Sequence, residues 1–183
     1  MMFISALVLA VLLTAGFVLT YNRFVKSGNL KAEAWSGIDV QLKRRYDLIP
    51  NLVATVKGYM QYEQDLLTRV TELRSLSMRA EDIGEKGRWE AGLAVAIRRL
   101  FAVAEAYPDL KSNGNFLELQ RSLVEIEDHI QLARRYYNGT VRDYNILVES
   151  FPSNLVALLI NRSKAAYFQV DDSTERAAPT VTV

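Results

Sequence analysis

The 183-residue sequence contains no cysteine and one histidine, and these shortages exclude several common kinds of functional site. Without cysteine there is no disulfide framework, no thiolate zinc site and no cysteine nucleophile. The nine glycines are scattered singly, so no glycine-rich loop is available to bind phosphate. With 22 basic and 21 acidic side chains, the net charge of +1 favours neither nucleic acid nor an acidic substrate as partner.

The single histidine, His129, is the first candidate for catalysis or metal binding. Glu125 precedes it by four residues, but a di-metal helical bundle uses a glutamate three residues before each of two histidines. Position 126 is Ile126, and no serine stands in a glycine-flanked elbow that would complete a triad. We therefore predict no catalytic residue, no metal site and no cofactor, and we expect His129 at the surface.

The basic triplet Lys43, Arg44 and Arg45 is the candidate for nucleic-acid binding. Three adjacent helical positions spread over almost a full turn, so the three charges cannot face one phosphate backbone together. Asp39 and Asp47 stand close enough along a helix to pair with two of them. We predict a solvated helix face and no nucleic-acid partner.

The first segment, MMFISALVLAVLLTAGFVLT, is a charge-free apolar run of the length that crosses a bilayer as a helix. We predict that residues 1–20 are a transmembrane anchor whose partners are membrane lipids. The side chains that we expect to hold the anchor in lipid are Phe3, Leu7, Val11, Leu12 and Phe17. A cleaved signal peptide, which would release a secreted or periplasmic protein, is the alternative, although no basic region precedes the apolar core.

Basic residues follow this segment, including Arg23, Lys26 and Lys31. By the positive-inside rule, we expect a single-pass membrane protein with its body in the cytoplasm. A periplasmic or extracellular body is the alternative. A homo-oligomer is compatible with the sequence, either through the heptad pattern of the long helices or through the anchor, where Ala6 and Ala10 form one small-xxx-small pair.

The rest of the chain has helical periodicity, and no segment alternates as a strand does. Two long apolar patterns have steps of three and four residues, the second in a nearly strict heptad repeat. They comprise Trp35, Ile38, Leu42, Tyr46, Ile49, Val53, Val56, Met60, Leu67 and Val70, and then Phe116, Leu119, Leu123, Ile126, Ile130, Ala133, Tyr137, Val141, Tyr144, Leu147 and Phe151. The fold class that follows is all-α, with an N-terminal transmembrane helix and an antiparallel bundle of long helices.

Local signals predict the element boundaries. Asn115, three residues before Glu118, is expected to cap the second long helix, and Pro152 to close it near Ser150. A shorter helix is predicted over 85–107, and one or two apolar turns over 154–160. We divide the chain into an anchor at residues 1–20, a bundle at 21–168 and a disordered tail at 169–183.

Several long motifs, RRYDLIPNLV, YPDL, VRDYN and ESFPSN, give the sequence between Tyr21 and Phe168 a close resemblance to the LemA family of bacterial membrane proteins. The resemblance implies an N-terminal transmembrane helix followed by a helical bundle, and it implies no enzymatic activity. A related branch of the family takes part in forming magnetosome membranes. Some relatives resemble lipoproteins with a cysteine at the anchor, which this chain lacks.

The function that we predict is a membrane-anchored scaffold or interaction module without catalysis, with an unidentified protein partner. The alternatives are a soluble extracytoplasmic bundle released by signal cleavage, or a member associated with magnetosome membranes.

Within RRYDLIPNLV, Pro50 lies inside a helical pattern. Proline removes one backbone hydrogen bond and crowds the carbonyl four residues earlier, so we predict one long helix with a bend near Asp47 to Ile49, or two nearly collinear helices. The apolar pattern keeps its phase across Pro50, which predicts that both sides face the same partner helices. Asp47 and Asn51 flank the freed carbonyls, and Arg45 or Arg142 is expected to satisfy these groups. Arg142 and Asp143 are predicted to form a polar staple across the bundle.

Overall fold

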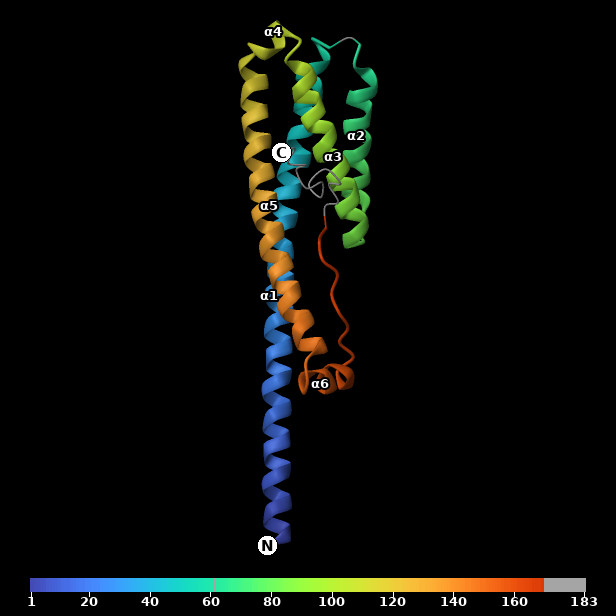
Figure 1. Ribbon diagram of the computed structural model, residues 1–183. Coiled ribbons are helices and arrows are strands. Elements are labelled where there is room, and N and C mark those ends of the chain that lie inside the picture. Colours follow the sequence, from blue (N-terminus) through green and yellow to red (C-terminus); the bar gives the residue numbers. More distant parts are fainter. Residues whose placement is uncertain (61, 170–183) are drawn as a thin grey trace, which may run out of the picture. The chain divides into compact units, whose positions relative to one another are not determined.

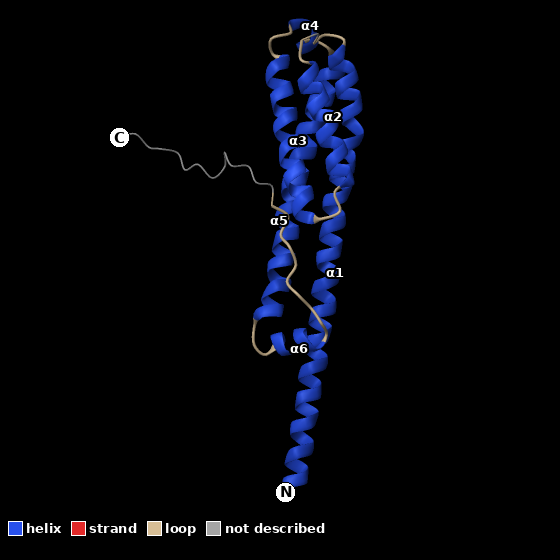
Figure 2. Cartoon of the chain, turned by 90° about the vertical axis from the view of Figure 1, so that its right-hand side faces the viewer, coloured by secondary structure: helices blue, strands red, loops and turns tan. Residues whose placement is uncertain are grey.

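The computed structural model describes residues 1–60 and 62–169. Its secondary structure there is entirely helical, which confirms the predicted all-α class (Figures 1 and 2). The helices are α1 (Met2–Lys57), α2 (Gln64–Arg79), α3 (Ile83–Ala104), α4 (Pro108–Lys111), α5 (Gly114–Glu149) and α6 (Ser153–Leu159). The described residues form two compact units, one of 1–38 with 133–166, and one of 39–60 and 62–132 with 167–169. The predicted division at residues 20 and 168 stays a prediction.

The second unit is a bundle made by the C-terminal part of α1, by α2 and α3, and by the N-terminal part of α5. Most of the predicted apolar positions are buried in it, as the helical period requires. One difference is at Val53, which is half-buried, while its neighbour Leu52 lies fully inside. The central cluster of this unit is Leu52, Val56, Met60, Leu67, Leu100, Ala104, Leu110, Phe116 and Leu123.

The first long apolar pattern belongs to two helices and not to one. Helix α1 ends at Lys57, the amides of Tyr59 and Met60 both donate to the Val56 carbonyl, and α2 begins at Gln64. Met60 is buried within this turn. The polar Glu63, which interrupts the apolar pattern, was the local sign of the break.

The middle of the second unit is close to the prediction. Helix α3 begins at Ile83, where the Asp82 side chain accepts a 2.8 Å hydrogen bond from the Glu85 amide as an N-terminal cap. The predicted cap of α5 at Asn115 is wrong, because Asn113 performs this role. Its side chain accepts a 3.0 Å hydrogen bond from the Phe116 amide, and the helix begins at Gly114.

The first unit contains α1 up to residue 38, the C-terminal part of α5, and α6. In α1 the side chains of residues 1–19 are all exposed, and α1 is the one helix in the described part of the chain that is long and apolar enough to cross a membrane. Farther along, Phe24 meets Tyr144 edge-on at 6.1 Å, and Trp35 meets Tyr137 at 5.3 Å. These aromatic pairs join α1 to α5 within this unit.

The end of α5 agrees with the expected effect of Pro152, since the helix stops at Glu149 and α6 begins at Ser153. Phe151 was expected to continue the buried heptad pattern, and this is wrong: it stands outside the helix and is 80% exposed. Helix α6 confirms the predicted apolar turns over 154–160. Of the predicted tail, only Gln169 falls within the described residues.

Candidate functional site

Pro50 lies inside α1, which continues through it to Lys57. The carbonyl that loses its helical donor to Pro50 is that of Tyr46, four residues earlier. A donor from another helix takes its place: Arg74 of α2 donates from Nε to the Tyr46 oxygen at 2.7 Å. The prediction that Arg45 or Arg142 would satisfy the freed carbonyl is therefore wrong for this oxygen, because Arg74 occupies it.

Arg45 is buried one residue before Tyr46 and forms an ion-pair cluster. Its Nη1 donates to Glu127 of α5 at 2.6 Å, and its Nη2 pairs with Glu90 of α3. Glu90 also accepts a hydrogen bond from the Tyr46 hydroxyl. Arg45 and Glu90 are each only 2% exposed. The cluster thus links α1, α3 and α5 inside one unit, starting from a residue one position before the carbonyl that Pro50 leaves without its helical donor.

Burial changes the electrostatics of this cluster. Loss of hydration lowers the pKa of Arg45, and the Glu127 carboxylate opposes that shift. Burial also raises the pKa of Tyr46 to about 12, so its phenol is neutral at physiological pH and donates to Glu90. Arg45 Nε has no hydrogen-bond acceptor among the described residues. Removal of either charge from such a buried pair leaves the other without compensation in a poorly hydrated site.

A pocket of about 260 Å³ opens beside this cluster, between α1, α3 and α5 of the second unit. Arg45 and Glu127 line it, and apolar side chains such as Ile97, Phe101 and Leu123 form much of the wall. Arg45 and Glu127 bond to each other, and Arg98, Asp128 and Gln131 add polar groups to a wall that is otherwise apolar.

The VRDYN motif acts through different residues from those predicted. Arg142 bonds to its neighbour Asp143 at 3.0 Å, and both side chains are about two-thirds exposed, so the predicted staple across the bundle is wrong. The buried polar residue of the motif is Asn145, beside the buried Val141 and Tyr144. Its amide donates to the Ala165 carbonyl at 3.0 Å and accepts from the Ala165 amide at 2.8 Å, which fixes the returning chain to α5.

The other predicted site residues are at the surface. Asp47 and Asn51 are exposed, as is Pro50 itself, and Pro152 directly precedes α6. The five anchor side chains, Phe3, Leu7, Val11, Leu12 and Phe17, are all exposed on α1. His129 is exposed as predicted, beside a shallow hollow that Arg44 and Asp47 also line. Within residues 1–60 and 62–169, no three metal-binding side chains gather.

Comparison of the sequence with known protein families identifies the family of this chain. The model of the LemA family matches residues 34–183, which include the Pro50 segment, the buried cluster and Asn145. The chain belongs to the LemA family.

Relatives of this LemA-family chain carry two kinds of name. Magnetosome protein MamQ 2 of Paramagnetospirillum magneticum is 28% identical over 195 aligned positions, covering 90% of this chain and 72% of the relative. Magnetosome protein MamQ of Magnetospirillum gryphiswaldense is 25% identical, covering 92% and 71%. Protein LemA of Metamycoplasma hominis is 27% identical, covering 82% and 69%.

The partners of Arg45 and Pro50 in this LemA-family bundle were missed from the sequence, although one signal was present. Glu90 is in helical phase with Leu93, Ile97 and Leu100, so it is an acidic residue on an apolar face that needs a buried partner. Arg45 falls likewise between Leu42 and Ile49. Helical phase shows that Arg45 and Glu90 are both buried, but it does not show that they pair with each other across two helices. No local sequence feature distinguishes Arg74 from the other arginines of α2 as the donor to the Tyr46 carbonyl.

Proposed function

We propose that this LemA-family protein is a single-pass membrane protein whose helical bundle is a non-catalytic scaffold or protein-interaction module. The observation that carries the proposal is α1, in which the exposed apolar residues 1–19 and the buried core positions of the bundle belong to one continuous helix. An apolar helix of this length without protein contacts is stable in lipid and not in water.

The buried polar groups favour a structural role over a catalytic one. Arg45 is paired with two carboxylates, and Tyr46 and Arg74 bond to groups of the same unit. Each of these side chains completes a contact between helices. The pocket beside Arg45 is the surface at which we expect a protein partner to place a side chain.

The first test is extraction of membranes that contain the full chain with alkaline carbonate. We expect the protein to stay in the membrane pellet with residues 1–20 intact, and a chain that lacks them to move to the supernatant. Recovery of a soluble mature form that begins after residue 20 would instead support the released bundle.

The second test addresses sidedness, for which Arg23, Lys26 and Lys31 favour a cytoplasmic bundle. The chain has no cysteine, so Leu132→Cys at an exposed position of α5 gives one reactive thiol. We expect a membrane-impermeant maleimide to label it only after cell lysis. Labelling in intact spheroplasts would place the bundle outside.

Association with magnetosome membranes is the second candidate, because relatives covering about 90% of this chain are named magnetosome proteins. It is tested by expressing the tagged chain in a bacterium that forms magnetosomes. Enrichment in the purified magnetosome fraction over the general membrane fraction would support it, and equal distribution would contradict it. Proximity labelling in the same cells identifies partners.

A further inference from the structure

Helix α6 and the turn before it carry large apolar side chains on two opposite faces. On the inner side, Ala157 is buried against Phe24 and Tyr144, with Val156 and Ile160 beside it. On the outer side the side chains are exposed, at 80% for Phe151, 55% for Leu155, 80% for Leu158 and 74% for Leu159. Within α6, the spacing of Leu155, Leu158 and Leu159 at i, i+3 and i+4 places them on one face, and Phe151 lies in the turn just before the helix. A short helix that is apolar on both sides requires a second apolar surface to cover it.

The position of α6 along α1 indicates which surface this is. Its inner face packs on Phe24, four residues after Thr20, where the apolar run ends. At about 1.5 Å per residue, Phe24 lies about 6 Å farther along the helix. The interfacial layer on each side of the hydrocarbon core has a similar thickness, roughly 5 to 7 Å. In Figures 1 and 2, α6 lies beside α1 at the point where α1 continues alone toward its N-terminus.

The C-terminal end of α6 is closed by backbone hydrogen bonds, and the chain beyond it is tied to α5. Asn161 has a left-handed backbone (φ 53°), and the amides of Asn161 and Arg162 donate to the carbonyls of Leu158 and Ala157, which closes the helix in a Schellman motif. Beyond it, Lys164 pairs with Glu149 of α5 at 2.8 Å. These contacts, with the packing of Ala157 on Phe24 and Tyr144, orient the outer face of α6 away from α1 and α5.

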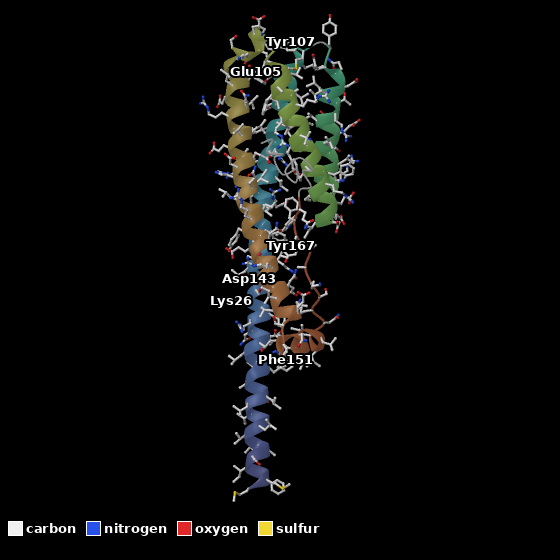
Figure 3. All side chains as sticks on the ribbon, viewed as in Figure 1. Lys26, Glu105, Tyr107, Asp143, Phe151 and Tyr167 are labelled. Atoms are coloured by element: carbon white, nitrogen blue, oxygen red, sulfur yellow. The ribbon has the colours of Figure 1, made fainter. Side chains whose placement is uncertain are left out.

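The charges near α6 suit a bilayer surface. Arg23 and Lys26 on α1 and Arg162 after α6 are exposed cations of the same unit; Figure 3 marks Lys26 and Phe151. Cations at this level attract anionic headgroups, while the apolar side chains between them reach the boundary with the acyl chains.

We propose that Phe151, Leu155, Leu158 and Leu159 insert into the headgroup and acyl-chain boundary of the bilayer that α1 enters, as a second membrane contact. This inference rests on the proposed membrane insertion of α1. It assigns α6 the role of fixing the depth and rotation of α1 in the membrane.

The test uses the absence of native cysteine. The full chain is reconstituted into vesicles of phosphatidylcholine and phosphatidylglycerol, as three single-cysteine variants that carry an environment-sensitive fluorophore. Leu158→Cys reports on α6, Leu12→Cys on the span, and Leu132→Cys on an equally apolar, exposed position of α5. Lipids with a nitroxide near the headgroup or deep in the acyl chain quench each label by contact.

We expect the label at 158 to be quenched several-fold more than that at 132, and more by the shallow nitroxide than by the deep one. The label at 12 is expected to show the reverse depth preference. Quenching at 158 no greater than at 132, with position 12 still quenched, would overturn the α6 contact and leave the anchor intact. Loss of quenching at 12 would overturn the anchor itself. Oxidative cross-linking of two Leu158→Cys chains without quenching would assign the face to a second copy and also overturn the proposal.

Discussion

Arg74 on α2 supplies the Tyr46 carbonyl on α1 with the hydrogen bond that Pro50 cannot give. A donor in a side chain of the neighbouring helix thus completes the backbone of α1. The proline penalty, roughly 3 kcal/mol in an unassisted helix interior, is partly offset by a charged hydrogen bond. This relationship explains how a proline is accommodated in a helix that has no other interruption up to Lys57.

Arg74→Ala is predicted to lower the free energy of unfolding by about 1.5 to 3 kcal/mol, the range for a hydrogen bond to a charged donor. Urea unfolding of the full chain in detergent, followed by circular dichroism, measures the loss. Arg79→Ala, at an exposed position of the same helix, is the matched control and should change little. In a Pro50→Ala background, residue 50 regains an amide that donates to Tyr46, so Arg74→Ala should cost much less there. Equal costs in both backgrounds would contradict the proposed compensation.

Arg45→Met is predicted to destabilise the bundle by about 3 to 5 kcal/mol, because it leaves Glu90 buried without a cation. Adding Glu90→Met should recover most of this loss, since removing both charges also removes their desolvation cost. Thermal unfolding of the two single variants and the double variant measures the effect. Arg44→Met, at the exposed neighbouring position, is the control. If the double variant were as unstable as the sum of the single ones, the two charges would not act as a pair.

Stability is predicted to fall at alkaline pH through Tyr46. Burial raises the pKa of Tyr46 from its ordinary value of 10.0 to about 12. The unfolded chain therefore loses the Tyr46 proton near pH 10 and the folded chain near pH 12, so this contribution is fully present below pH 10 and is lost as pH rises toward 12. The difference corresponds to at most about 3 kcal/mol.

The pH dependence is checked by comparing unfolding free energies across that interval for the native chain and for Tyr46→Phe. The variant is less stable at neutral pH because it loses its hydrogen bond to Glu90, but its stability should fall less steeply above pH 10. Tyr136→Phe, on an exposed side chain, should keep the native slope. Parallel slopes for all three proteins would refute the assignment to Tyr46.

Asn145→Ala is predicted to release the segment around Ala165 from α5, because both hydrogen bonds of this pair are lost. The expected cost is about 1 to 3 kcal/mol. Limited digestion with trypsin should cut faster at Arg162 and Lys164, which lie just before the segment. Asp143→Ala, exposed on the same helix, should leave the digestion rate unchanged. Unchanged cleavage in Asn145→Ala would show that other contacts hold the segment.

The helices were predicted well from the sequence where the apolar periodicity agrees with local signals for helix ends, such as caps and prolines. The heptad positions from Phe116 to Tyr144 are largely buried, and α5 ends within a residue of the expected place. The errors occur where periodicity continues across a turn, as between Val56 and Leu67. Apolar side chains on both sides of the turn face one core, so the spacing hides the reversal of the chain.

The polar site was less predictable because its partners come from different helices. A buried arginine requires a carboxylate, but the sequence does not say which one. Glu90 and Glu127 are separated from Arg45 by long stretches of chain and meet it only in the folded bundle. In VRDYN the opposite charges of Arg142 and Asp143 suggested a staple, yet adjacent residues on a helix are close enough to bond each other at the surface. The neutral amide of Asn145 was overlooked because amides give no charge signal.

The close approach of the C-terminal segment to α3 limits how the protein can be truncated or tagged. Phe168 is completely buried, and a Cβ added at Gly87 of α3 would collide with the Gln169 carbonyl. The backbone of the segment therefore fills the space that this glycine leaves. A reporter joined at residue 160 would remove Phe168 and Gln169 and expose the surface of α3 around Gly87. A topology reporter is therefore better joined after Val183, because Phe168 and Gln169 then stay packed against α3.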